Sequence, residues 1–395
     1  MADLKIFAYH VEEEALNQIF TLVKQPAFAD CKIRVMPDVH AGKGCVIGFT
    51  ADMGDKVIPN IVGVDIGCGM NTVELGKIEI DFQKPDDLIR RRVPSGRNAN
   101  ENIICPFDLT GLKCYHYLKE KDWIQKSLGS LGGGNHFIEI DMDADGGKYL
   151  VIHTGSRNLG KQVAEYYQNM AIDLFHGRTA KRKEMEKLIT EYKAAGRVKE
   201  IQAGIAALKK KSTPGSGVPK ELCYLTGERR KAYLHDMKIC QQFAALNRST
   251  IARVILDGMG WKSLNSFETV HNYIEHESNI VRKGAISAKK GERLLIPINM
   301  RDGCIIGIGK GNPYWNESAP HGAGRVMSRS EAKERVSLEE YEESMRGVFT
   351  TSVNRATIDE SPMAYKPMLE IIEKISPTVE IERIIKPIYN FKAGE

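Results

Sequence analysis

The sequence has no apolar run that approaches the roughly 20 residues needed to span a bilayer, so no transmembrane segment is predicted. The first residues, Met-Ala-Asp-Leu-Lys, lead into Glu12, Glu13 and Glu14 rather than into the apolar core of a secretory signal. We therefore expect a cytoplasmic protein with no membrane partner. A hydrophobic fraction of 42% and a charged fraction of 27% are typical of globular proteins, and 395 residues suffice for a large core.

Paired cysteine spacings are also missing. There is no CxxC, so in a reducing compartment most of the eight cysteines should be free, buried thiols. They are Cys31, Cys45, Cys68, Cys105, Cys114, Cys223, Cys240 and Cys304. Only Cys68 lies in an unusual context, which is described below.

A P-loop is excluded as well, and no internal repeat is evident. Residues 307–312 contain Gly-x-Gly-Lys-Gly, but the Gly-x4-Gly-Lys-Ser/Thr order of that motif is absent. The net charge of +5 is mild but unevenly placed. Residues 178–211 carry eleven Lys/Arg against four Glu, a net charge of +7, which leaves −2 for the remainder. Such a segment attracts polyanions, and a solvated helical face is the alternative reading.

The chain is organised around Val62–Met70, an apolar segment that enters a glycine-rich turn. Asp65 and Cys68 lie three residues apart in this turn, and glycine permits the tight backbone that would aim both at one point. A carboxylate and a thiolate together suit a borderline transition metal. A turn carboxylate beside a buried thiol is the alternative for this pair alone.

Further histidines follow predicted strands or glycine turns. His136 follows three consecutive glycines, His153 ends the strand Tyr149–Ile152, and His271 lies in the strand Thr269–Ile274. Imidazole and thiolate are common ligands of transition metals, so these histidines join Asp65 and Cys68 as five candidate ligands. His116, in a tyrosine-rich segment, is read as an ordinary histidine.

His321 differs, because its loop of small residues carries two arginines, Arg325 and Arg329. Phosphate can approach such a loop, guanidinium groups grip it in a bidentate manner, and a histidine there can act as a phosphoryl-transfer nucleophile. The residues alone thus indicate a metal-dependent phosphoryl-transfer site. The alternative is a set of unrelated histidines.

The coarse pattern predicts an α+β protein. Helical periodicity covers residues 10–24 and 161–258, and the second stretch is expected to be a helical insertion that closes over a β-rich core. Strands are expected at Ile33–Met36, where Pro37 should end the strand, at Cys45–Phe49 and at Val57–Val64. The last stretch, from residue 338, should be helical and then extended.

Seven motifs, in order along almost the whole chain, resemble the RtcB family of GTP-dependent RNA ligases. They are Met36-Pro-Asp-Val-His-Ala-Gly-Lys-Gly, Val64-Asp-Ile-Gly-Cys-Gly-Met, Gly134-Asn-His-Phe-Ile-Glu, His153-Thr-Gly-Ser-Arg, His271-Asn, Arg282-Lys-Gly-Ala and His321-Gly-Ala-Gly-Arg-Val-Met-Ser-Arg. The resemblance implies one RtcB-like catalytic domain over residues 1–395, with a mixed-sheet core around the metal site.

The activity implied by this resemblance joins RNA ends bearing a 2′,3′-cyclic phosphate or 3′-phosphate to 5′-hydroxyl ends, using GTP and two Mn²⁺ ions. His321 matches the histidine that forms a covalent GMP adduct, and Asp38 matches the carboxylate that orients it. The five candidate ligands match the two-manganese centre, with Cys68 bridging. An accessory or release-factor-like protein is a further implied partner.

Other matching positions are assigned by the resemblance to nucleotide and RNA. The nucleotide-binding set is Asn135, Glu139, Asn299, Met300, Ala323, Gly324, Tyr365 and Lys392. The RNA-binding set is His40, Arg157, Arg325 and Arg329.

The chain departs from the family pattern at residues 298–304, where Asn299 and Cys304 replace two hydroxyl residues that usually help to hold GTP. The added charges of Arg301 and Asp302 would alter the preference for nucleotide or RNA end. The chain looks like a bacterial subgroup, so RNA repair is expected rather than dedicated tRNA splicing. Two alternatives stay open: an enzyme that guanylylates 3′-ends or opens cyclic phosphates but seals weakly, and an RNA-binding rescue factor with a vestigial site.

Overall fold

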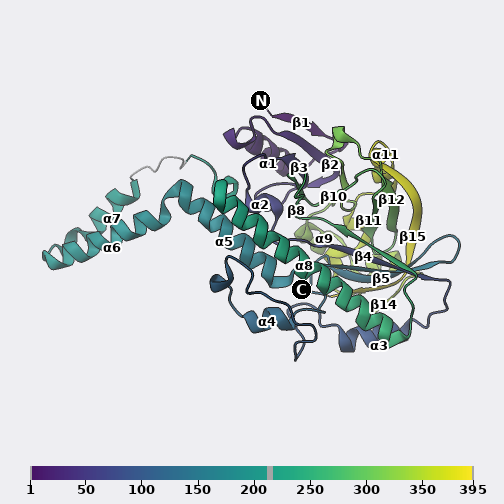
Figure 1. Ribbon diagram of the computed structural model, residues 1–395. Coiled ribbons are helices and arrows are strands. Elements are labelled where there is room, and N and C mark those ends of the chain that lie inside the picture. Colours follow the sequence, from purple (N-terminus) through teal and green to yellow (C-terminus); the bar gives the residue numbers. More distant parts are fainter. Residues whose placement is uncertain (1, 211–216, 394–395) are drawn as a thin grey trace.

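The largest of three β-sheets forms the centre of the molecule (Figure 1). The computed structural model describes residues 2–210 and 217–393. Along the sheet the order is β11 (Arg293–Asn299), β12 (Gly303–Gly309), β15 (Val379–Lys392), β5 (Phe137–Met142), β6 (Lys148–Thr154), β4 (Gly69–Gly76) and β7 (Asn265–Val270), and β14 (Phe349–Thr350) pairs with β15. The two end strands approach each other, because the Leu295 N–H of β11 donates to Thr269 Oγ1 of β7 at 2.9 Å. The sheet is therefore nearly closed.

Two smaller sheets complete the β-rich core. One has the order β1 (Asp3–Ile6), β2 (Lys32–His40), β3 (Ile47–Asp52), β9 (Ile280–Lys283) and β8 (Tyr273–Ile274); the other pairs β10 (Ala285–Ser287) with β13 (Ser318–Pro320). The β1–β2 pair is parallel, whereas the remaining pairs of the five-stranded sheet are antiparallel.

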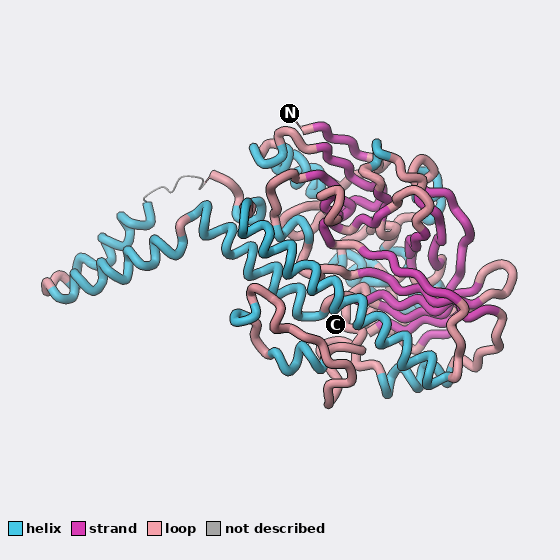
Figure 2. Tube along the Cα trace, viewed as in Figure 1, coloured by secondary structure: helices cyan, strands magenta, loops and turns pink. Residues whose placement is uncertain are grey.

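The described part of the chain also contains helices, several of which cross the face of the core seen in Figure 2. They are α1 (Glu13–Val23), α2 (Pro59–Val62), α3 (Gln83–Arg92), α4 (Lys121–Lys126), α5 (Arg157–His176), α6 (Arg178–Ala194), α7 (Ile201–Lys210), α8 (Gly227–Met259), α9 (Arg329–Arg335), α10 (Leu338–Ser344) and α11 (Met368–Ile375). Ile251 and Ile255 of α8 pack on Leu150 and Ile152 of β6 in one buried cluster. By contrast, α6 and α7 extend away from the body (Figure 1). No helix in the described ranges has both the length and the apolar character to cross a membrane.

The α+β single-domain fold predicted from the sequence is confirmed. The long helical stretch begins at Arg157, four residues before the expected start at 161, and its description as an insertion stays a prediction. Of the basic segment 178–211, Lys211 lies outside the described residues.

Two strand predictions are wrong at prolines. Strand β2 does not end at Pro37 but continues to His40, since an irregularity in its register with β3, between Val35 and His40, accommodates the proline. The expected strand Val57–Val64 is instead the single-turn helix α2, which has Pro59 at its first position, where a missing N–H costs nothing. Ile61 and Val62 are buried in either case, so hydrophobicity alone did not distinguish the two structures.

Candidate active site

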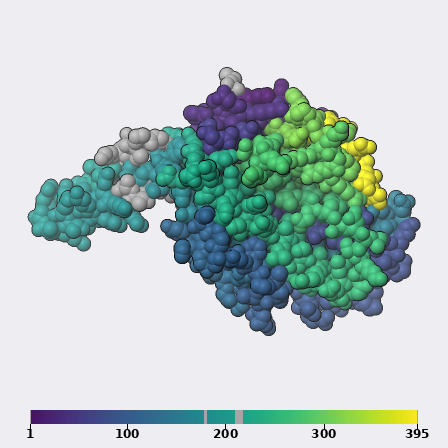
Figure 3. Space-filling view, viewed as in Figure 1, coloured from purple at the N-terminus to yellow at the C-terminus, as the bar shows by residue number. Residues whose placement is uncertain are grey.

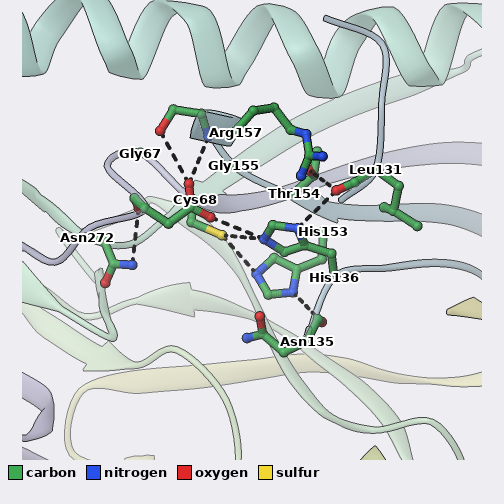
Figure 4. A network of polar contacts seen from close by, with 12 residues as sticks. Gly67, Cys68, Leu131, Asn135, His136, His153, Thr154, Gly155, Arg157 and Asn272 are labelled. Atoms are coloured by element: carbon green, nitrogen blue, oxygen red, sulfur yellow. Dashed lines mark hydrogen bonds and ion pairs between the residues drawn. The ribbon is translucent and has the colours of Figure 1, made fainter. Parts of the chain in front are cut away.

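Four of the candidate ligands come together because their strands are neighbours in the large sheet. Cys68 precedes β4, His136 precedes β5, His153 lies in β6 and His271 follows β7. In the register, His153 faces Phe137 of β5 and Met70 of β4, and Gly69 faces Val270 of β7. The ends of four strands thus bring one thiol and three imidazoles to a single edge, as Figure 4 shows for Cys68, His136 and His153.

Glycine is required where the backbone passes these side chains. A Cβ at Gly155 would lie 2.3 Å from the Asp65 carboxylate, and one at Gly69 would lie 2.4 Å from the Thr269 carbonyl oxygen. Any larger residue would displace Asp65 or separate β4 from β7. Asp65 itself is held by the Ser156 backbone N–H, which donates to Oδ1 at 3.0 Å.

The ligand atoms form two groups that share Cys68. Its Sγ lies 3.4 Å from the Nε2 atoms of both His136 and His153. His136 Nε2 lies 3.2 Å from Asp65 Oδ2, and His153 Nε2 lies 3.2 Å from His271 Nε2. One group therefore contains Asp65, Cys68 and His136, and the other contains Cys68, His153 and His271.

Backbone carbonyls orient two of the imidazoles. His136 Nδ1 donates to the Leu131 carbonyl at 2.9 Å and His153 Nδ1 donates to the Asn135 carbonyl at 3.2 Å (Figure 4). In the neutral ring, with its proton on Nδ1, each Nε2 presents a lone pair to the centre of the cluster. A charged His136 instead donates from Nε2 to Asp65 Oδ2. Donor atoms about 3.4 Å apart are the spacing expected around one ion with metal–ligand distances near 2.1 Å. The residues present therefore fit a pair of transition-metal ions.

Burial has shifted the pKa values of these groups in opposite directions. Burial and the nearby imidazoles lower the pKa of His153 well below its usual value, and burial lowers that of His271 to about 3. Burial and Asp65 raise the pKa of the Cys68 thiol. Burial also tends to raise the pKa of Asp65, but hydrogen bonding and charge from His136 outweigh it and lower the value to about 2. Neutral imidazoles and an ionised carboxylate are the forms that bind metal.

His321 lies beside this cluster and contacts a buried carboxylate. Its Nδ1–H donates to Asp38 Oδ2 at 2.6 Å, and its backbone N–H donates to the same oxygen at 3.1 Å. Asp38 lies in β2 and is fully buried, whereas His321 follows β13. The ring centroids of His321 and His271 are 4.8 Å apart. Because Nδ1 is engaged, Nε2 is the ring nitrogen left for chemistry.

A cavity of about 650 Å³ opens next to His321 and His153. All the predicted nucleotide-binding residues line it: Asn135, Glu139, Asn299, Met300, Ala323, Gly324, Tyr365 and Lys392. Of the predicted RNA-binding residues, His40, Arg325 and Arg329 also line it. Arg157 does not: its Nε donates to Ser130 Oγ at 3.0 Å and its guanidinium to the Gly96 carbonyl at 2.9 Å, next to the metal-ligand cluster.

Glu360 was not predicted from the sequence, yet its carboxylate forms ion pairs or hydrogen bonds with four residues that line the cavity. Its carboxylate accepts from Tyr365 Oη at 2.6 Å and pairs with Lys392 Nζ at 2.7 Å and Arg329 at 2.7 Å. Arg325 lies 3.4 Å from it. Burial opposes ionisation of Glu360, but the charges of Lys392 and Arg329 lower its pKa to about 2. Only its place in an acidic Asp-Glu pair between basic motifs could have pointed to it.

A second missed residue is Asp141, behind the cavity wall. Ligand atoms of Glu139, Asp141 and Cys304 lie within 4.8 Å of one another, and all three side chains are buried. Neither carboxylate oxygen of Asp141 has a hydrogen-bond partner among the described residues. Burial and Glu139 raise the pKa of Asp141, and burial raises that of Glu139 to about 7, against the effects of Asn390 and Lys392.

The divergent segment 299–304 is internally satisfied. Asn299 Nδ2 donates to Asp302 Oδ2 at 2.8 Å, and the Arg301 guanidinium pairs with the same aspartate at 2.8 Å. Cys304 is buried toward Glu139 and Asp141. The added charges therefore neutralise each other beside the cavity.

Comparison with known proteins identifies the family. The family model described as tRNA-splicing ligase RtcB matches residues 18–108 and 113–393. The chain belongs to the RtcB family. Curated RtcB proteins show the same relationship. The RNA-splicing ligase RtcB of Escherichia coli K12 is 31% identical, with 94% of this chain and 92% of the relative covered.

More distant RtcB relatives span most of the chain too. The tRNA-splicing ligase RtcB of Aeropyrum pernix is 26% identical over 89% of this chain and 85% of its own length. The RNA-splicing ligase RtcB of Mycobacterium tuberculosis is 27% identical over 86% and 91%, respectively. The resemblance seen in the seven motifs is thus confirmed as membership of the RtcB family.

Proposed function

We propose that this protein is an RNA ligase that joins 2′,3′-cyclic phosphate or 3′-phosphate ends to 5′-hydroxyl ends, using GTP. The observation that carries the proposal is the 2.6 Å contact of His321 with Asp38, placed beside a thiol–imidazole cluster at the end of a cavity. This combination suits nucleotidyl transfer through a histidine. Family membership supports the same chemistry.

The cofactor proposed is a pair of Mn²⁺ ions, held by Asp65, Cys68, His136, His153 and His271. When bound, such ions neutralise phosphate charge and polarise the reacting oxygens. The chain's own contribution is the geometry. The Leu131 and Asn135 carbonyls fix two imidazoles, and Ser156 holds the carboxylate.

In the first proposed step, His321 Nε2 attacks the α-phosphorus of GTP, the bond to the bridging oxygen breaks, and pyrophosphate leaves. A P–N bond to GMP forms at Nε2 while Nδ1 keeps its proton. The imidazole ring therefore carries a positive charge. Asp38 accepts the hydrogen bond from Nδ1–H and stabilises the positive charge, as a buried carboxylate does for a catalytic imidazole. Arg325 and Arg329, which line the cavity, are the proposed phosphate partners.

In the second proposed step, an oxygen of the RNA 3′-phosphate takes GMP from His321, which regains its neutral ring. The 5′-hydroxyl of the other RNA end then attacks the activated 3′-phosphorus and loses its proton to water, the phosphodiester forms, and GMP leaves. A cyclic phosphate must first be opened by water. His40, Arg157, Arg325 and Arg329 are the proposed RNA contacts, and Glu139 is the proposed acceptor for the N1–H and N2 donors of guanine.

The proposed role is RNA repair, with an accessory or release-factor-like protein as a further partner. The competing proposal is an enzyme that guanylylates 3′-ends or opens cyclic phosphates but seals weakly. Its basis is the replacement of two hydroxyl residues by Asn299, which lines the cavity, and by the buried Cys304. The vestigial-site alternative is disfavoured by the intact Asp38–His321 contact.

The proposal is tested by incubating the protein with Mn²⁺ and GTP labelled at the α-phosphate. We expect a protein-bound label that acid removes and alkali does not, because a phosphoramidate has that stability. His321→Asn should abolish it, whereas His116→Asn, at an exposed histidine, should not. Labelled RNA ends then separate the two proposals, since capped ends without joined product mean weak sealing. If neither the protein nor the RNA became labelled, both the ligase proposal and the weak-sealing proposal would be refuted.

A further inference from the structure

The arm, residues 178–210, consists of α6, α7 and the turn between them and projects from the body. Figure 3 shows the arm standing clear of the rest of the molecule. From residue 181 to 208 no described side chain is buried. The two helices hold each other through a small apolar seam, where Gly204 allows Leu188 and Tyr192 to approach. Ordering such an extension costs conformational entropy, and the extension adds nothing to the hydrophobic core. We therefore look for its role in the side chains on its surface.

That surface carries a surplus of positive charge. Between 181 and 200 there are seven Lys/Arg and four Glu. Three arginine or lysine side chains pair with glutamates on the arm: Arg182 with Glu186, Lys187 with Glu191 and Arg197 with Glu200. In this described part of the arm, no carboxylate pairs with the remaining four cations, Lys181, Lys183, Lys193 and Lys199.

The composition of the arm favours a polyanion over a membrane. Among the described residues of the arm, Val198, at 57% exposure, is the one large hydrophobic residue that is exposed. A helix that binds a membrane surface needs a continuous apolar face instead. A helix of 17 residues such as α6 is about 25 Å long. Lysines spread over that length match a string of phosphates better than a single anionic group.

The base of the arm adjoins the wall of the active-site cavity. His176, at the end of α5, contacts the Val218 carbonyl oxygen at 3.0 Å through Nε2. This contact joins the segments that precede and follow the arm in the sequence. Just beyond, the Glu221 carbonyl accepts from Asn60 Nδ2 at 3.3 Å, and Glu221 packs against Gly44. Residues 40–43 line the cavity. A polyanion whose end lies in the cavity can therefore extend toward the arm.

We propose that the α6–α7 arm is an RNA-backbone-binding element that holds the body of the RNA whose end is in the active site. This inference rests on the proposed ligase function. It assigns the arm sequence-independent contacts to phosphates, made by its four unpaired lysines.

The test compares two variants with the same change in net charge. One is Lys181→Glu/Lys183→Glu/Lys193→Glu/Lys199→Glu on the arm. The control is Lys24→Glu/Lys77→Glu/Lys262→Glu/Lys290→Glu, at exposed lysines of the body. Binding of a fluorescent hairpin RNA with a 3′-phosphate is measured by anisotropy at several salt concentrations, beside a short oligonucleotide with the same end. Circular dichroism checks that both variants are folded.

We expect the arm variant to bind the hairpin at least tenfold more weakly at low salt. Four lost phosphate contacts should also reduce the slope of log K against log salt by about 3. The short oligonucleotide, which does not reach the arm, should bind equally well to both variants. Equal hairpin affinity and slope in the arm and body variants would overturn the inference.

Labelling with α-labelled GTP needs no RNA and separates the two proposals. If the arm variant forms the protein–GMP adduct normally but loses hairpin binding, both proposals stand. If the unmodified protein forms no adduct, the proposed function fails, while the binding comparison still decides what the arm does.

Discussion

At the scale of single residues, the site depends on which nitrogen of each histidine is already engaged. Leu131, Asn135 and Asp38 each take one Nδ1–H, and each of these contacts leaves an Nε2 facing the cluster or the cavity. In the proposed mechanism the same type of side chain would thus serve either to hold metal or to act as a nucleophile. The difference lies in the partner, which is a neutral carbonyl in the first role and a carboxylate in the second.

Asp38→Asn should therefore slow the formation of the protein–GMP adduct by about a hundredfold to ten-thousandfold, because the amide stabilises the imidazolium poorly. Metal content should not change, since Asp38 is not in the ligand cluster. Rates of labelling and metal analysis check this, with Asp52→Asn at an exposed carboxylate as the control. A normal labelling rate would remove Asp38 from the mechanism.

Glu139 should make binding of guanine nucleotide depend on pH. Its pKa is raised to about 7 by burial, and only the ionised form accepts from both guanine donors. Below that pH the nucleotide must displace a proton, so GTP affinity should fall by up to about tenfold per pH unit as pH is lowered. Titration calorimetry with metal-free His321→Asn protein, in which no transfer occurs, measures the slope.

The control for this prediction is Glu139→Gln in the same background. It should bind GTP more weakly, with an affinity that no longer varies with pH, because glutamine does not titrate. If the slope persisted, another group would be the one that titrates.

At the scale of elements, the buried carboxylate of Glu360 forms ion pairs with residues of two different elements. Glu360, next to α9, joins Lys392 at the end of β15 to Arg329 at the start of α9. Lys392 and Glu360 are 4% and 3% exposed in their side chains. Their contact keeps the end of β15 against the cavity wall, so the proposed nucleotide site depends on an element that the motifs do not include.

Glu360→Gln should destabilise the protein by about 3–5 kcal/mol, because Lys392 and Arg329 would lose a buried counter-charge. The matched control is Glu343→Gln. It breaks the exposed Glu343–Arg346 pair, whose side chains are 59% and 78% exposed, and should cost less than about 1 kcal/mol. Urea unfolding of both variants gives the comparison. Equal losses would mean that the buried network contributes little.

At the scale of the whole molecule, protons and the proposed metal ions would compete for the same residues at the ends of four neighbouring strands. The cluster draws on the ends of β4, β5, β6 and β7, so ions bound there would tie four strands together. The pKa of His153 is lowered and that of His271 is lowered to about 3, so the folded metal-free protein keeps both neutral.

The metal-free protein should therefore lose stability as pH falls from about 7 toward about 4. In that range the unfolded chain takes up protons on His153 and His271, whereas the folded protein does not. A fixed Mn²⁺ concentration of about a hundred times the Kd at pH 7.5 should raise the free energy of unfolding at that pH by about 2.7 kcal/mol per site. The gain should be greater at pH 7.5 than at pH 5.5, because metal must displace the proton of the Cys68 thiol.

Urea unfolding with Mn²⁺ or with a chelator, at both pH values, checks these expectations. Cys68→Ser should lose most of the Mn²⁺ effect, whereas Cys105→Ser, outside the cluster, should keep it. An Mn²⁺ effect of the same size in both variants would contradict the metal assignment.

Local sequence determined much of this molecule. The glycines before Cys68 and His136 predicted turns, and the helical periodicity of residues 10–24 and 161–258 predicted helices. Both agree with the described residues, because these signals act over a few residues. The motifs were sufficient to indicate the family. Local signals failed at Pro37 and at 57–64, where pairing with β3 and the first position of a one-turn helix decided the structure.

Only the tertiary structure decided which residues come into contact. Strand order and register, which result from packing over the whole sheet, brought Cys68 to His136, His153 and His271. Glu360 and Asp141 had no local pattern to announce them, because their roles arise from burial beside residues distant in sequence. The charge of the arm could be read from the sequence, but its separation from the body is a property of the folded molecule.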